Sequence, residues 1–341
     1  MISERWKLLS GEENWKNLLE PLDIDLRRYI IHYGERAEAT YDTFNNQKVS
    51  RFAGSSIYAE THLFDCVGLL QGNPFKYNAV KYLYATSKIG VADGFIMKPL
   101  AKNAEMEESN WIGYVAVATD EGKNELGRRD ILIAWRGTVR AIEWAKDFEF
   151  PLVSANEILG KNHHQQDEAY VHQGVLSIYT SFDSNSTYNK DSARDQVLKE
   201  VQKQVDALKD EEISITITGH SLGAALATLN AADIVANGHN KTCLVSVFSF
   251  GSPLIGDSNF RDVFQSMQNL HLLQIRNVPD IVPLYPPLLG YSRVGEELYI
   301  DSRDSTYLKD GDFVTWHNLE ASYLHTMAGT QGSKGGFHLE R

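Results

Sequence analysis

The residues most suggestive of chemistry are 219–223, which read Gly-His-Ser-Leu-Gly. Residues 213–218 alternate isoleucine with serine or threonine, as a strand does, and a helix-forming stretch follows the second glycine. A serine between a strand and a helix in this pattern is held up as a nucleophile at the edge of a sheet. The pentapeptide alone is a weak signal, and an incidental serine at a strand-helix junction is the alternative. The context favours Ser221 as a nucleophile.

A serine nucleophile needs a base and a carboxylate that orients the base. In this kind of strand-turn-helix arrangement both should come downstream, the acid first. Residues 272–275 read as an apolar strand, and Asp280 follows in the loop beyond the strand's carboxyl end. The alternative is a turn residue that caps its own backbone between two prolines. We predict that Asp280 orients the base.

Three histidines, His317, His325 and His338, come after Asp280. His317 begins a stretch that reads as a loop entering a helix, from which an imidazole ring can turn toward both serine and aspartate. His325 lies about two turns further along that helix, where we expect it to be committed to packing. His338 lies near the end of the sequence. His317 is therefore the predicted general base, with His325 as the alternative.

The oxyanion formed on the attacked carbonyl needs two N–H donors. One should be the N–H of Leu222, the residue after the nucleophile. The other should come from the loop after an earlier strand, and residues 131–138 fit, because an apolar run ends there at a glycine and Thr138. A strand that ends at a glycine turn is common, so Thr138 gains weight only together with the other motifs.

Four motifs together resemble the class 3 (fungal-type) lipase family: residues 135–138, 219–225, 278–283 and 317–320. Within that family the sequence is similar to the plant class II phospholipase A1 enzymes, which cleave the sn-1 acyl ester of glycerophospholipids. The resemblance implies an α/β-hydrolase fold and an acyl-enzyme mechanism. It assigns Ser221 as the nucleophile, Asp280 as the acid and His317 as the base. It assigns the oxyanion hole to Thr138 and Leu222.

The same resemblance places a lid helix directly after Thr138. Ile142 and Phe148 would share one apolar helical face there, with Trp144 beside it. A lid of this kind would turn its apolar face toward a bilayer or micelle and uncover the serine. A fixed amphipathic helix that covers the core is the alternative.

Helices and strands alternate along the sequence. The first 110 residues are expected to be mainly helical, notably residues 33–45 and 74–89, and residues 192–210 carry one apolar stripe. The alternation predicts an α/β fold with a mostly parallel central sheet and helices on both faces. The first two strands are expected to form an antiparallel hairpin at its edge. The predicted strands are residues 114–119, 131–135, 213–218, 244–250 and 272–275.

The chain's 341 residues are 43% hydrophobic, enough to bury a sizeable core. We expect one domain over residues 1–341, with residues 1–110 as a helical amino-terminal cap and residues 330–341 as a flexible tail. No metal or organic cofactor is expected. Members of the plant group commonly run on past the final histidine, whereas this sequence ends soon after it.

The net charge of -12 argues against binding nucleic acid or anionic lipid surfaces through bulk electrostatics. Contact with a membrane or micelle should therefore be transient, local and apolar. The two cysteines, Cys66 and Cys243, are expected to be packed thiols. Together with an amino terminus of mixed charge that matches no leader pattern, they predict a cytoplasmic protein.

The predicted activity is hydrolysis of the sn-1 acyl ester of glycerophospholipids. A galactolipid, a mono- or triacylglycerol, or a small soluble ester is the alternative substrate, because one sequence does not reveal the shape of an acyl pocket. A lipase-like scaffold without catalysis is the alternative from another class. A scaffold, however, has no need of a serine, an acid, a base and an oxyanion loop together.

Overall fold

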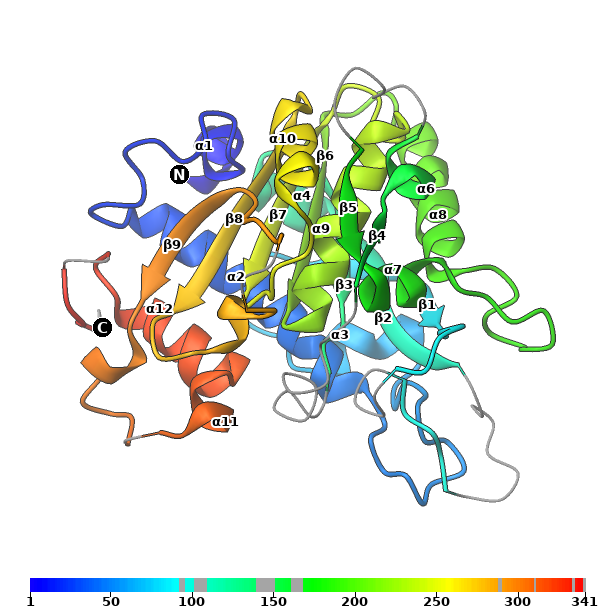
Figure 1. Ribbon diagram of the computed structural model, residues 1–341. Coiled ribbons are helices and arrows are strands. Elements are labelled where there is room, and N and C mark those ends of the chain that lie inside the picture. The colour runs from blue at the N-terminus through cyan, green and yellow to red at the C-terminus, as the bar shows by residue number, and fades with distance from the viewer. Residues whose placement is uncertain are drawn as a thin grey trace.

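The computed structural model describes residues 1–91, 96–100, 109–138, 151–160, 168–287, 290–309, 311–332 and 335–339. A seven-stranded sheet runs through the molecule in the order β1-β2-β3-β6-β7-β8-β9 (Figure 1). The strands β3, β6, β7, β8 and β9 are parallel, and β1 and β2 extend the sheet antiparallel. The bounds are β1 Tyr77–Ala85, β2 Asn110–Ala118, β3 Arg129–Trp135, β6 Ile213–His220, β7 Leu244–Phe250, β8 Leu270–Asn277 and β9 Glu296–Ile300.

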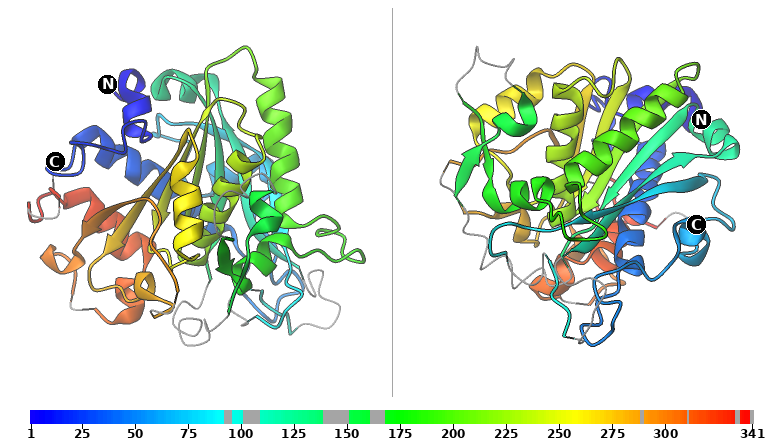
Figure 2. Two further views of the ribbon diagram at one scale, coloured as in Figure 1. Left: turned by 45° about the horizontal axis from the view of Figure 1, so that its top comes forward. Right: turned by 90° about the vertical axis from the view of Figure 1, so that its right-hand side faces the viewer.

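Successive strand residues point to opposite sides of the sheet, and both faces of this sheet are buried. In β3, Ile131 and Ile133 join one hydrophobic core, while Leu132 between them joins the other. One core lies under α7 (Gln173–Thr180), α8 (Ala193–Ala207), α9 (Leu222–Ala236) and α10 (Ser258–Ser266). The other lies under α1 (Ile2–Leu9), α2 (Ile24–Thr43) and α12 (His325–Gly329), on the opposite side of the sheet in Figure 2. The predicted mostly parallel α/β architecture is confirmed.

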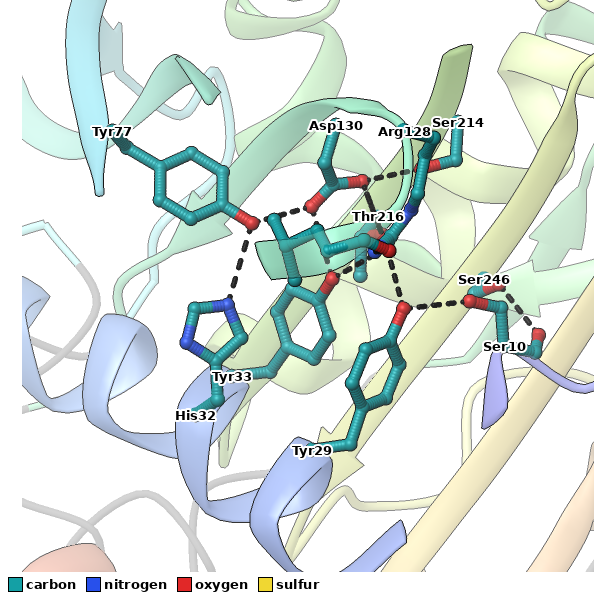
Figure 3. Close-up of polar contacts among 11 residues, drawn as sticks. Ser10, Tyr29, His32, Tyr33, Tyr77, Arg128, Asp130, Ser214, Thr216 and Ser246 are labelled. Atoms are coloured by element: carbon teal, nitrogen blue, oxygen red, sulfur yellow. Dashed lines mark hydrogen bonds and ion pairs between the residues drawn. The ribbon is translucent and has the colours of Figure 1, made fainter. Parts of the chain in front are cut away.

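A buried polar cluster ties α2 to the sheet (Figure 3). Arg128 and Asp130 are fully buried and lie 3.4 Å apart. Asp130 accepts hydrogen bonds from the hydroxyls of Tyr33 on α2 and Tyr77 on β1, at 2.9 and 2.7 Å. Arg128 donates in turn to the hydroxyls of Tyr33 and Tyr29. Every partner is a strong donor or acceptor removed from water, so the cluster holds α2 in one position against β3 and β6.

Two expectations about the edge of the sheet are wrong. Residues 74–89 were predicted as helix, yet they contain strand β1. Register shifts between Ala79 and Lys81 and between Leu83 and Tyr84 interrupt the two-residue alternation of this strand, which hides it in the sequence. Strands β2 and β3 are antiparallel as predicted, but helix α4 (Asp120–Leu126) joins them, and β1 occupies the edge.

Shorter elements surround the sheet. The two-stranded ribbon of β4 (Leu152–Ser154) and β5 (Tyr170–His172) is antiparallel.

In the tail, Thr330 forms a β-bridge with Phe337, and the Phe337 ring stacks on His325, so this part of residues 330–341 packs on α12. The flexibility of the tail stays a prediction. No described helix is long and apolar enough to cross a membrane. Short helices among the described residues include η1 (Glu60–His62), α3 (Leu63–Cys66), α6 (Asn156–Leu159), η3 (Val282–Leu284), η4 (Ser302–Asp304) and α11 (Phe313–Trp316).

Candidate active site

Ser221 stands on a sharp turn between β6 and α9, as the sequence predicts. Its backbone has a φ of 60°, a left-handed conformation that is strained for a residue with a side chain. The turn is crowded: a Cβ on Gly219 would clash with the backbone of Gly223, and a Cβ on Gly223 would clash with the carbonyl of Trp135 on β3. The two glycines therefore permit the close approach of strand and helix that places the serine at one edge of the sheet.

Asp280 lies in the loop after β8, three residues past the strand's last residue, and is 3% exposed. Its Oδ1 accepts a hydrogen bond from the N–H of Val282 at 2.9 Å. Its Oδ2 lies 2.7 Å from Nδ1 of His317 and accepts the hydroxyl of Tyr323 at 2.5 Å. The carboxylate is therefore fixed on both oxygens, and the predicted pairing of Asp280 with His317 is present.

His317 ends the short helix α11 and is 2% exposed. Its ring lies against the ring of His220, with 4.4 Å between the centroids. Because His220 directly precedes Ser221, this contact sets the imidazole beside the serine turn. Within the described part of the chain, neither Nε2 of His317 nor Oγ of Ser221 has a hydrogen-bond partner. This arrangement is expected where the base and the hydroxyl form their hydrogen bond only after a substrate binds.

The other two histidines lie elsewhere. Nε2 of His325 is 2.7 Å from the hydroxyl of Ser305, and its ring stacks on Phe337. His338 donates its backbone N–H to the carbonyl of Gly329. His325 is thus committed to packing, as expected, and no hydrogen bond joins His325 to Asp280.

The two predicted oxyanion donors end up at the same edge of the sheet. Leu222 is the first residue of α9, where a backbone N–H has no partner inside the helix. Thr138 is 3% exposed and lines a cavity together with His317. The predicted lid residues Ile142, Trp144 and Phe148 lie outside the described residues.

Two hydrogen bonds at this edge cannot be predicted from the sequence. The hydroxyl of Tyr41, near the end of α2, is 2.7 Å from Nδ1 of His220. Burial, followed by the neighbouring His317, holds the pKa of His220 well below its ordinary value, so this ring stays neutral. Burial raises the pKa of Tyr323, so its hydroxyl keeps the proton that it donates to Asp280. Tyr323 lies on the π-helix η5 (Leu319–Leu324), so its spacing from His317 follows no α-helical period.

Known proteins are similar to this chain in sequence. Residues 132–290 match the model of the Lipase (class 3) family. Phospholipase A1-IIgamma of Arabidopsis thaliana is 52% identical over 341 residues, which cover 97% of this chain and 80% of that protein. Phospholipase A1-II 1 of Oryza sativa subsp. indica is 51% identical over 340 residues, which cover 99% and 85% of the two chains.

Solved structures share the fold at low sequence identity. Lip2 lipase from Yarrowia lipolytica is 20% identical, with a TM-score of 0.52 over 82% of this chain and 80% of that chain. Rhizomucor miehei triacylglyceride lipase is also 20% identical, with a TM-score of 0.51 over 81% and 80% of the two chains. Both likenesses support the α/β-hydrolase fold. With half of its residues identical to phospholipases A1-II over nearly its whole length, the chain belongs to their group within the class 3 lipases, a family of carboxylic ester hydrolases.

Proposed function

We propose that the protein hydrolyses the sn-1 acyl ester of glycerophospholipids through an acyl-enzyme on Ser221. The observation that carries the proposal is the bond from Nδ1 of His317 to Asp280, which leaves Nε2 unpartnered beside the serine turn. The phospholipase A1-II names of relatives about half identical to this chain support the choice of substrate.

Acylation begins when Oγ of Ser221 attacks the ester carbonyl and Nε2 of His317 takes its proton. Asp280 holds the ring in the tautomer that keeps Nε2 free and stabilises the imidazolium that forms. The N–H groups of Leu222 and Thr138 stabilise the negative charge on the carbonyl oxygen. Both donors are backbone groups at the edge of the sheet where β3 and β6 end.

Collapse of the tetrahedral intermediate breaks the bond to the glycerol oxygen. His317 returns its proton to that oxygen, and the lysophospholipid leaves. Water then attacks the acyl-serine with His317 again as base, the same donors hold the second oxyanion, and a free fatty acid is released. The cycle regenerates the hydroxyl of Ser221 and consumes one water molecule.

We propose that contact with a bilayer or micelle is transient and is made by apolar side chains around the site. Val278 and Leu284 flank Asp280 in sequence, and Phe313 and Val314 precede His317; at least half of each of these residues is exposed. With a net charge of -12, such local apolar contacts are the route by which the protein reaches an interface.

We propose a cytoplasmic location. Both cysteines are free thiols, as expected in a reducing compartment. Cys243 is partly buried, but Cys66 is exposed, so the expectation of a packed thiol is wrong for Cys66. Fractionation of cells that express the tagged full chain tests this, and recovery of the chain from the secreted fraction would contradict it.

A panel of lipids resolved by headgroup and by ester position tests the activity, with Ser221→Ala as the blank. Release of the sn-1 fatty acid by the wild type, and not by the variant, supports the proposal. If fatty acid is released preferentially from galactolipids or acylglycerols, the proposed substrate is wrong and the proposed mechanism stands. Equal activity of wild type and variant would overturn the mechanism, and a folded wild type that hydrolyses no ester would favour a scaffold.

A further inference from the structure

A cavity of about 270 Å³ lies between the end of α2 and the start of η5. Its wall includes Thr138 and His317, so one end of the cavity is the place where the reacting ester would lie. Glu38 on α2 also lines it. The cavity therefore joins the reaction centre to a carboxyl group that has no part in the proposed chemistry.

Two further carboxyl groups lie close to Glu38. Asp42 is one helical turn further along α2, on the same face. Glu320 is exposed on η5 and directly follows Leu319, which lines the cavity. Burial raises the pKa of Glu38 to about 7, and the neighbouring Asp42 and Glu320 add to the rise. In the described part of the chain, none of the three forms an ion pair with a lysine or arginine, and the neighbours that shift the pKa values of Glu38 and Asp42 are carboxyl groups. Three carboxyl groups thus converge without a counter-charge.

An unpartnered group in the cavity wall also points to a ligand. His220 is 4% exposed and lines the cavity, and its Nε2 has no hydrogen-bond partner among the described residues. Tyr41, which holds Nδ1 of His220, lines the cavity too and contributes an aromatic ring. None of the described residues in the wall is a lysine or arginine. The cavity wall therefore offers one carboxyl group, an aromatic ring and one imidazole nitrogen without a hydrogen-bond partner, and two further carboxyl groups lie close to Glu38. This set favours an organic cation.

We propose that this cavity is the headgroup subsite, which holds the ammonium group of a choline or ethanolamine phospholipid. With the ester carbonyl between Thr138 and His317, the ammonium lies near Glu38, Asp42 and Glu320 and beside the ring of Tyr41. A headgroup with net negative charge, such as glycerol phosphate, meets three like charges there and is disfavoured. The inference rests on the proposed phospholipase activity and adds a preference for zwitterionic over anionic phospholipids.

Competition between two lipids in one interface tests the subsite. Phosphatidylcholine and phosphatidylglycerol with identical acyl chains are mixed in equal amounts in neutral detergent micelles at pH 8. Both lipids then share one surface charge, so repulsion between the protein and the micelle cannot decide the result. Mass spectrometry of the two lysophospholipids gives the choline-to-glycerol product ratio for the full chain and its variants.

We expect the wild type to favour phosphatidylcholine and Glu38→Gln to lower the product ratio about 3- to 10-fold. The matched control is Glu296→Gln, which removes the same charge from an exposed position at the start of β9. This variant should keep the wild-type ratio. An unchanged ratio in Glu38→Gln, or a wild type that favours phosphatidylglycerol, overturns the subsite while the phospholipase activity stands. A wild type that cleaves neither lipid overturns both.

Discussion

Tyr323 and Asp280 are joined by a hydrogen bond in which the tyrosine hydroxyl donates to the carboxylate Oδ2 at 2.5 Å. The same oxygen is bonded to Nδ1 of His317. One carboxylate oxygen therefore serves both the base and a buried tyrosine. Tyr323 is fully buried, so this bond is shielded from water. We regard Tyr323 as a positioning residue for the acid, acting on His317 through Asp280.

Tyr323→Phe should keep the fold and lower kcat about 3- to 30-fold, because the carboxylate loses a group that orients it. The loss should appear in kcat and leave KM nearly unchanged, because the hydroxyl acts on Asp280 and not on the lipid. Tyr299→Phe is the control, since Tyr299 donates to Glu297 on the surface of β9. An unchanged kcat in Tyr323→Phe, or a loss confined to KM, would contradict the positioning role.

Asp280→Asn should lower kcat by about three to four orders of magnitude with little change in KM. Asparagine keeps the shape of the side chain but loses the charge that stabilises the imidazolium. Steady-state kinetics with an sn-1-labelled phospholipid measure the effect. Asp262→Asn, an exposed position on α10, should behave as wild type. A loss below about tenfold in Asp280→Asn would remove this residue from the proposed triad.

Ser221→Gly should abolish hydrolysis and stabilise the fold by about 1 kcal/mol. Glycine adopts the observed φ of 60° without strain, and it removes a buried hydroxyl that has no described partner. Asn269→Gly, at a turn with a φ of 61°, should give a smaller gain and keep activity, because asparagine tolerates this conformation better. Thermal unfolding measures both variants. A destabilised Ser221→Gly would argue against strain at the turn.

Glu38→Gln should stabilise the protein at pH 8 and not at pH 4.5. The folded protein raises the pKa of Glu38 from 4.5 to about 7, so native stability falls as pH rises across this window. Asp42, Glu320 and the aromatic and imidazole groups of the cavity wall face Glu38 and supply no positive charge. The gain at pH 8 should be about 1 to 3 kcal/mol, measured by urea unfolding at both pH values. An equal effect at both pH values would show that the charge of Glu38 is not the cause.

Asp130→Ala should destabilise the protein by about 3 to 5 kcal/mol, because it leaves Arg128 buried without its carboxylate. It also removes the acceptor for Tyr33 and Tyr77, which tie α2 and β1 to β3. Asp206→Ala, which breaks an exposed pair with Lys241, should change the unfolding midpoint little. Comparable midpoints for the two variants would show that the buried cluster contributes little to stability.

The sequence by itself determined the features that depend on neighbouring residues. The serine turn is readable because its strand, its two glycines and its helix are contiguous from Ile213 to Ala236. The parallel sheet is readable because strands buried on both faces are apolar runs between helices. Asp280 and His317 follow from motifs of a few residues each and from the order in which they occur.

Only the tertiary structure decided the contacts between distant segments. The sequence of β1 predicts a helix, because the register shifts of this strand exist only in its pairing with β2. Tyr323 reaches Asp280 through a π-helix, whose period a search for α-helical spacing does not detect. Glu38 and Glu320 lie 282 positions apart, and no local pattern relates them. Local patterns specify which backbone forms, whereas the packing of α2 and η5 against the sheet edge decides which side chains share one cavity.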